Sequence, residues 1–137
     1  MKSVFRLTVR GYELDSFGHV NNAVYLQYAE AAKWDFFENT GLLEKMQAQG
    51  LFPVIMESNL RYLHELRIAE KVVIRTDWAY HGGIVEFKHL IQSETTGKKS
   101  CKITGKLVFV NQDHIICDIP EAVRICLESE ANEADIE

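Results

Sequence analysis

Four polar residues lie close together near the start of the chain, just before a long apolar stretch. They are Asp15, His19, Asn21 and Asn22, and Gly18 among them lets the backbone turn tightly. A carboxylate and a histidine held beside the N–H groups at the start of a helix can perform acid–base or nucleophilic chemistry on a polarised carbonyl. The same residue types also have ordinary uses, because Asp commonly closes a turn and Asn commonly caps a helix. Residue types and spacing alone therefore allow both a catalytic and a structural interpretation.

A long helix is predicted directly after this turn. Of the 16 residues from 23 to 38, 11 are apolar. They leave a narrow polar arc that holds Gln27, Glu30, Asp35 and Glu38. A helix that is apolar around most of its circumference is typical of a buried helix. We therefore expect Trp34 and Phe37 to lie in the core.

Alternating apolar and polar residues predict strands in most of the remaining chain. The predicted strands cover residues 4–10, 54–62, 72–80, 85–91 and 101–109. Short helices are expected at 42–49 and from Pro120 to about Leu127. Since one twisted sheet can wrap one buried helix, we predict an α+β fold: a curved antiparallel sheet around a long helix, in one domain over residues 1–127.

Composition narrows the partners and the location. A chain of 137 residues with 47% hydrophobic and 26% charged residues is typical of one soluble globular domain. The net charge of −5 argues against nucleic acid as a partner, and no apolar run approaches the ~20 residues of a membrane span. The acidic residues 128–137 have too little apolar content to fold, so we expect a disordered tail. Three cysteines without C-x-x-C spacing and an N-terminus without a signal-peptide core predict free thiols, no zinc and a cytoplasmic location.

The polar turn is also part of a longer motif. It reads Asp15-Ser-Phe-Gly-His-Val-Asn-Asn-Ala-Val-Tyr25, with Glu30 behind it and the pair Arg61-Tyr62 on a later strand. This motif and the order of the elements resemble the hotdog-fold thioesterases of the 4-hydroxybenzoyl-CoA thioesterase type. The chain departs from the family pattern after the Arg-Tyr pair, where relatives commonly have Pro and this chain has Leu63-His-Glu65. Those positions lie near the part that shapes the substrate channel in relatives.

The resemblance implies hydrolysis of an acyl-CoA thioester to the free acid and CoA. Asp15 would be the catalytic carboxylate, acting as nucleophile or as general base toward water. The backbone N–H of Asn22, at the positive end of the helix, would polarise the thioester carbonyl. His19 and Asn21 would orient water or substrate, or serve only the turn.

Several residues are expected to contact the substrate. By resemblance they are Gly18, Asn21, Tyr25, Glu30, Arg61 and Tyr62. Glu30 either lines the site or pairs with a cation such as Arg61, and we favour the pair. Arg61 and Tyr62 could bind the carrier arm of the thioester, although an Arg on the outward phase of a strand is more often only solvated.

Other functions and carriers stay open at this point. The same fold could serve a hydratase or dehydratase, or a non-catalytic module that binds an acyl-CoA or an acyl carrier protein. No metal or redox cofactor is implied, and coenzyme A enters only as part of the substrate. One sheet around one helix leaves an open edge, so we expect a homodimer or homotetramer. By resemblance, the active site would then lie at the subunit interface.

Overall fold

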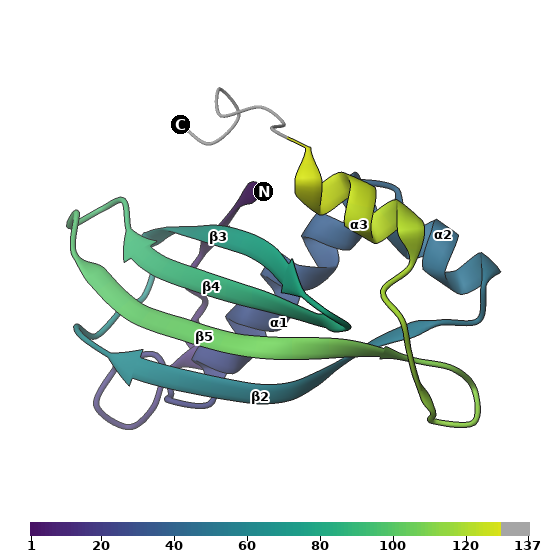
Figure 1. Cartoon of the computed structure of the whole chain (residues 1–137). Coiled ribbons are helices and arrows are strands. Elements are labelled where there is room, and N and C mark those ends of the chain that lie inside the picture. Colours follow the sequence, from purple (N-terminus) through teal and green to yellow (C-terminus); the bar gives the residue numbers. More distant parts are fainter. Residues whose placement is uncertain (130–137) are drawn as a thin grey trace.

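One antiparallel sheet carries a long helix on one face (Figure 1). The computed structural model describes residues 1–129 of the 137. The strands are β1 (Lys2–Thr8), β2 (Phe52–Tyr62), β3 (Lys71–His81), β4 (Ile84–Ser93), β5 (Lys99–Val110) and β6 (Ile116–Cys117). Their order is β1-β3-β4-β5-β2, with β6 paired to β5. This confirms the predicted α+β architecture, and the five predicted strands lie where alternation placed them, with ends that differ by at most two residues. The short strand β6 was not predicted.

The helix α1 (Val24–Asn39) packs on the sheet through its aromatic residues. The ring of Phe36 stacks on Trp78 of β3, with centroids 4.6 Å apart and planes 16° from parallel. Phe37 is 1% exposed, which confirms its predicted place in the core. Burying a large aromatic side chain stabilises a fold by about 1.5–3 kcal/mol. This aromatic layer therefore fixes where the C-terminal end of α1 lies over the sheet.

The sheet does not enclose α1, and one prediction is wrong for that reason. Trp34 is 38% exposed and Leu26 is 40% exposed, so neither lies in the core. The indole N–H of Trp34 donates to the Glu30 carboxylate at 3.2 Å. The apolar arc of α1 is wider than the side that one sheet can cover. Helical periodicity shows that such an arc exists but not how much of it is covered.

Shorter helices close one end of the fold. The helices α2 (Leu42–Ala48) and α3 (Glu121–Glu128) stand together beyond the end of the sheet in Figure 1. A 3-10 turn, η1 (Gly11–Glu13), precedes the polar turn. The helix α3 ends at Glu128, one residue inside the predicted tail, and residues 130–137 of that tail lie outside the described residues.

The strand β2 forms one edge of the sheet and is irregular at its middle. Its register with β5 shifts between Ile55 and Glu57, so Met56 is an extra residue in a β-bulge. A side chain at Gly105 of β5 would collide with the Glu57 carbonyl and the Phe87 ring. The bulge therefore requires glycine at this point of the neighbouring strand.

Candidate active site

A hollow lies between the polar turn and the end of β2. It has a volume of about 250 Å³, and we call it the polar hollow. Its lining residues are Asp15, His19, Val20, Asn22 and Tyr25 on one wall, and Tyr62, Leu63, His64 and Glu65 on the other. Five of the nine predicted site residues therefore meet in one place.

The carboxylate of Asp15 folds the polar turn around itself. Its Oδ1 accepts hydrogen bonds from the backbone N–H groups of Phe17 at 2.8 Å and His19 at 3.1 Å. Gly18 closes the turn with φ of 76°, a conformation that other residues rarely adopt. Within residues 1–129, no protein group hydrogen-bonds the second oxygen, Oδ2. One oxygen thus fixes the carboxylate, and the other remains available for chemistry.

A buried carboxylate anchors this turn to α1. Glu13 is nearly buried and accepts hydrogen bonds from the Tyr28 hydroxyl at 2.8 Å and the Arg10 backbone N–H at 2.7 Å. The Glu13 carbonyl accepts the N–H of Asn21 at 2.9 Å. Burial and the hydrogen bond to Glu13 raise the pKa of Tyr28 above its usual range. Tyr28 therefore stays protonated and keeps donating to Glu13.

The start of α1 presents an unpaired N–H to the polar hollow. The side chain of Asn21 accepts the Ala23 N–H at 3.0 Å, and its carbonyl accepts the Val24 N–H at 2.9 Å. The ordinary capping use of asparagine therefore falls to Asn21 and not to Asn22. Among the described residues, the Asn22 N–H has no acceptor. It is therefore free to donate to a ligand at the positive end of α1.

Tyr62 ties the two walls together. Its hydroxyl donates to the Asn22 carbonyl at 3.0 Å, and its ring meets Tyr25 edge-on with centroids 5.4 Å apart. Burial raises the pKa of Tyr25 to about 12, and burial also raises the pKa of Tyr62. Both phenols are therefore neutral near pH 7, and the end of β2 has a fixed position relative to Asn22.

The motif gave no role to the two ionisable residues of the second wall, His64 and Glu65. Nδ1 of His64 lies 3.6 Å from Oε2 of Glu65, and the Arg67 guanidinium lies 3.5 Å from Oε1 of Glu65. The backbone N–H of Glu65 itself, then His64, His19 and Arg67, hold the pKa of Glu65 below its usual range. The departure from the family pattern after Tyr62 was the only sequence signal for these residues.

Four predicted residues lie outside the polar hollow. Gly18 and Asn21 belong to the turn but do not line it. Glu30 pairs with a cation, as favoured, but the cation is Lys33 at 2.9 Å and not Arg61. Arg61 lies opposite Lys102 of β5. Side chains alternate between the two faces of a strand, and these two are on the face that points away from α1. The sequence spacing puts Lys33 one turn from Glu30, but it could not show that this side of the helix is covered.

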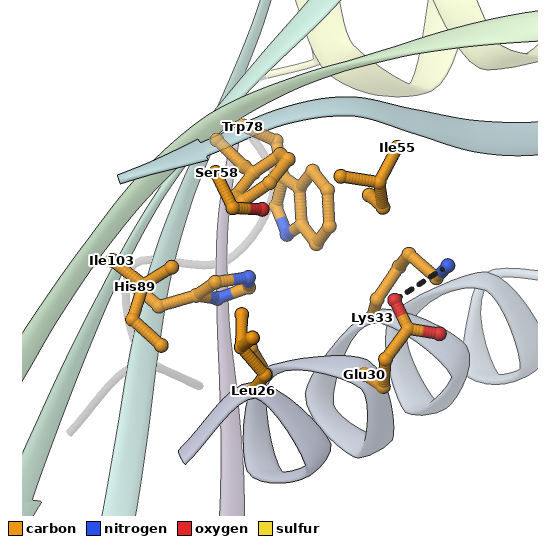
Figure 2. A pocket seen from close by; sticks show the side chains of 10 residues that line it. Leu26, Glu30, Lys33, Ile55, Ser58, Trp78, His89 and Ile103 are labelled. Atoms are coloured by element: carbon orange, nitrogen blue, oxygen red, sulfur yellow. Dashed lines mark ion pairs between the residues drawn. The ribbon is translucent and has the colours of Figure 1, made fainter. Parts of the chain in front are cut away.

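A second hollow lies farther along α1, between this helix and the sheet (Figure 2). We call it the apolar hollow; its volume is about 280 Å³. It is lined by Leu26, Ala29, Glu30, Lys33, Ile55, Ser58, Trp78, Phe87, His89 and Ile103. Leu26 is one helical turn from Asn22, about 6 Å along the axis, so the two hollows adjoin one face of α1.

Two ionisable residues interrupt the apolar wall. Lys33 is 4% exposed, and its ammonium pairs with Glu30, as Figure 2 shows. Nδ1 of His89 lies 2.6 Å from the Thr76 hydroxyl. Burial, and then the charge of Lys33, lower the pKa of His89 to about 4. His89 is thus a neutral residue of the wall at neutral pH.

Within residues 1–129, no three His, Cys, Asp or Glu side chains gather where they could hold a metal ion. No helix in the same range has the length and apolar character to cross a membrane.

The sequence is similar to those of known proteins. Over 69 residues the chain is 36% identical to the long-chain acyl-CoA thioesterase FadM of Escherichia coli, which is 50% of this chain and 52% of FadM. Over 120 residues it is 29% identical to the chloroplastic acyl-acyl carrier protein thioesterase ATL3 of Arabidopsis thaliana, 86% of this chain and 63% of that protein. The chain thus spans between half and two thirds of the length of these relatives.

Solved structures agree along nearly the whole chain. The Thermus thermophilus protein TT1821 superposes with a TM-score of 0.81 at 31% identity, covering 93% of this chain and 95% of that one. A DHNA-CoA thioesterase from Staphylococcus aureus has a TM-score of 0.78 at 22% identity, covering 85% and 80%, which supports the hotdog fold alone. The model of the thioesterase-like superfamily matches residues 9–127. This chain, with its helix-wrapping sheet and its Asp15 turn, therefore belongs to the thioesterase-like superfamily.

Proposed function

We propose that this protein hydrolyses an acyl-CoA thioester to the free acid and CoA. The observation that carries the proposal is the pairing, in the polar hollow, of a carboxylate oxygen without a protein partner and a helix N–H without an acceptor. Those are Oδ2 of Asp15 and the N–H of Asn22. The names of the relatives, which are thioesterases, support the same reaction class.

The reaction needs a nucleophile on one side of the carbonyl and a hydrogen-bond donor at its oxygen. The thioester oxygen would accept the Asn22 N–H, which stabilises negative charge as the carbonyl carbon becomes tetrahedral. Asp15 either removes a proton from an attacking water or attacks the carbon itself. In a single turnover in ¹⁸O-water, label that enters the Asp15 carboxylate identifies attack by Asp15, because water then opens the acyl–aspartyl anhydride at the aspartyl carbon.

The apolar hollow is the proposed site for the acyl group. It begins one turn of α1 beyond the oxygen-binding N–H, and its walls are mainly the apolar side chains Leu26, Ile55, Trp78, Phe87 and Ile103. From Asn22 to Lys33 the helix rises about 16 Å. An acyl group lying along this face would leave its thioester beside Asp15.

The carrier and the assembly belong to the same proposal. We propose CoA as the carrier, with acyl carrier protein as the alternative that the relative ATL3 suggests. The edge strand β2 exposes Phe52, Val54 and Met56, so a second copy paired along this edge would form a homodimer. Light scattering tests the dimer, and a fully active monomer would exclude it.

No cofactor takes part in the proposed reaction. Asp15, water and backbone N–H groups suffice, so neither a metal nor a redox group is called for. We also propose a cytoplasmic location, because Cys101, Cys117 and Cys126 are free thiols that suit a reducing compartment.

A thiol-release assay tests the proposed function. Acyl-CoA and acyl-carrier-protein thioesters of graded length are offered to the full chain, and free thiol is followed with time. Turnover that disappears in Asp15→Asn supports the proposal. Binding of acyl-CoA without release of thiol would instead identify an acyl-binding module, and hydration of an unsaturated acyl group would identify a hydratase.

A further inference from the structure

We infer that His64 is the general acid that protonates the departing thiolate. This inference rests on the proposed hydrolysis and adds a catalytic residue to the wall of the polar hollow opposite Asp15. The position lies where the chain departs from the family pattern.

The backbone places His64 at a fixed point of that wall. The N–H groups of Leu63 and His64 both donate to the Ser100 carbonyl, at 2.9 and 3.3 Å. Two residues earlier, the Tyr62 hydroxyl is bonded to the Asn22 carbonyl. The chain beyond β2 is therefore held on both sides. A thioester whose oxygen lies at Asn22 would lie between Asp15 and His64.

The charges around His64 suit a proton donor. Oε2 of Glu65 lies 3.6 Å from Nδ1 of His64, and Glu65 is an anion at neutral pH. The carboxylate is therefore close enough to hold the orientation of the imidazole ring through Nδ1. Nε2 is then the nitrogen left to face the hollow. The other titratable groups around this pair are Asp15 and His19 from the turn, Arg67 from the loop after β2, and the neutral phenols of Tyr25 and Tyr62.

The step balances as follows. Water adds to the carbonyl carbon, and one of its protons passes to Asp15. The tetrahedral intermediate then collapses, the C–S bond breaks, and its electron pair remains on sulfur. The proton on Nε2 of His64 passes to that sulfur, giving the free thiol, while Asp15 holds the proton from water. Release of that proton to solvent, with uptake of one by His64, restores the starting state.

A pair of thioesters with one acyl group and different leaving groups tests this step. The first is the N-acetylcysteamine thioester. Its leaving group is an alkyl thiol that resembles the end of CoA and has a pKa near that of cysteine, about 8.5. The second is a nitrothiophenyl thioester, whose thiolate is stable at neutral pH without protonation. A residue that protonates sulfur matters for the first substrate and not for the second.

His64→Gln is compared with the native chain on both substrates. We expect kcat/KM for the alkyl thioester to fall about tenfold to a hundredfold. This loss is at or below the lower end of the range typical of general acid–base catalysis, because a thiolate is a good leaving group even without a proton. The rate with the aryl thioester should change less than about threefold. His81→Gln, an exposed histidine at the end of β3, is the matched control and should change neither rate.

Each other outcome overturns the inference. An equal loss on both substrates would place His64 in the attack step or in substrate positioning, and no loss would make it a bystander. Asp15→Asn should abolish both activities. A failure of the proposed function is recognised separately, because the native chain would then cleave neither thioester. Glu65→Gln should show the same selective loss as His64→Gln at smaller size, since Glu65 acts only through His64. A loss with Glu65→Gln that does not depend on the leaving group would exclude this role.

Discussion

The two hollows beside α1 have similar volumes and opposite chemistry. The polar hollow is built from loops and strand ends, with Asp15, His19, His64 and Glu65 in its walls. The apolar hollow is built from the middle of α1 and the interior of the sheet, and its charges are neutralised as the ion pair between Lys33 and Glu30. Catalytic groups need free oxygen and nitrogen atoms, which loop and helix ends supply. Binding of an acyl group needs covered apolar surface, which only packed elements supply.

The largest effect is expected in the polar hollow. Asp15→Asn keeps an oxygen that can accept the two N–H groups of the turn, so folding should be preserved, but it removes the charge. Turnover should fall by about a hundredfold to ten-thousandfold. Steady-state kinetics and thermal unfolding measure the two properties. Asp77→Asn, an exposed carboxylate on β3, is the control, and near-native turnover of Asp15→Asn would refute the assignment.

Next in size is the loss of packing behind the apolar hollow. Phe37→Ala should lower the free energy of unfolding by about 3–5 kcal/mol, because it leaves a cavity beside Trp78. Trp34→Ala, on the exposed side of α1, should cost less than about 1 kcal/mol by comparison. Urea unfolding of both variants provides the measurement. Equal losses would mean that α1 is covered on both sides.

The apolar hollow should make the stability of the fold depend on pH. The pKa of His89 is about 4 in the fold and about 6.5 when unfolded, so the unfolded chain binds the extra proton between these values. The stability of the native chain is therefore retained above about pH 6.5 and is lost as pH falls toward 4. From pH 7 to 5 this site should cost about 2 kcal/mol. In His89→Gln, the free energy of unfolding should decrease less between pH 7 and pH 5 than in the native chain. In His81→Gln it should decrease as much as in the native chain, and unfolding curves at both pH values measure the difference.

Filling the apolar hollow should change selectivity rather than chemistry. Leu26→Trp reduces the space one turn beyond Asn22 while leaving Asp15 in place. For long acyl thioesters kcat/KM should fall about tenfold or more, within the range that differences of one or a few methylene groups produce, and for acetyl thioesters it should change little. A uniform loss across acyl lengths would show that the acyl group lies elsewhere.

The smallest effect should come from Asn22→Ala. The variant keeps the backbone N–H that would hold the thioester oxygen, and the native side chain makes no cap bond, so turnover should change less than about threefold. Asn21→Ala, which removes the bond to the Ala23 N–H, should instead cost about 1 kcal/mol of stability. Kinetics and unfolding of the two neighbours together separate the oxygen site from the cap. A large kinetic loss in Asn22→Ala would bring its side chain into the reaction.

Local patterns were enough to place the elements but not their environments. Alternation placed five strands, and the Asp15 motif led to five residues that meet in one hollow. The motif did not indicate His64 and Glu65, because they enter the site only through the fold of β2 onto the start of α1. Periodicity likewise put Trp34 inside and gave Lys33 no buried role, since which side of a helix is covered depends on distant strands. Residues that are neighbours in the sequence determine a turn. Packing between distant elements determines which side chains are buried and which charges pair.

The bulge at Met56 has a consequence for assembly. Along a regular edge strand, outward N–H and C=O groups alternate without interruption, so a second strand could dock at many offsets. The extra residue reverses that phase halfway along β2, and the two halves of the edge demand different alignments. A second copy related by a twofold axis could pair with both halves of β2 only if the bulges of the two copies lay symmetrically about that axis. In the proposed dimer, this one residue would therefore fix how the two edge strands align and would disfavour open-ended stacking of sheets.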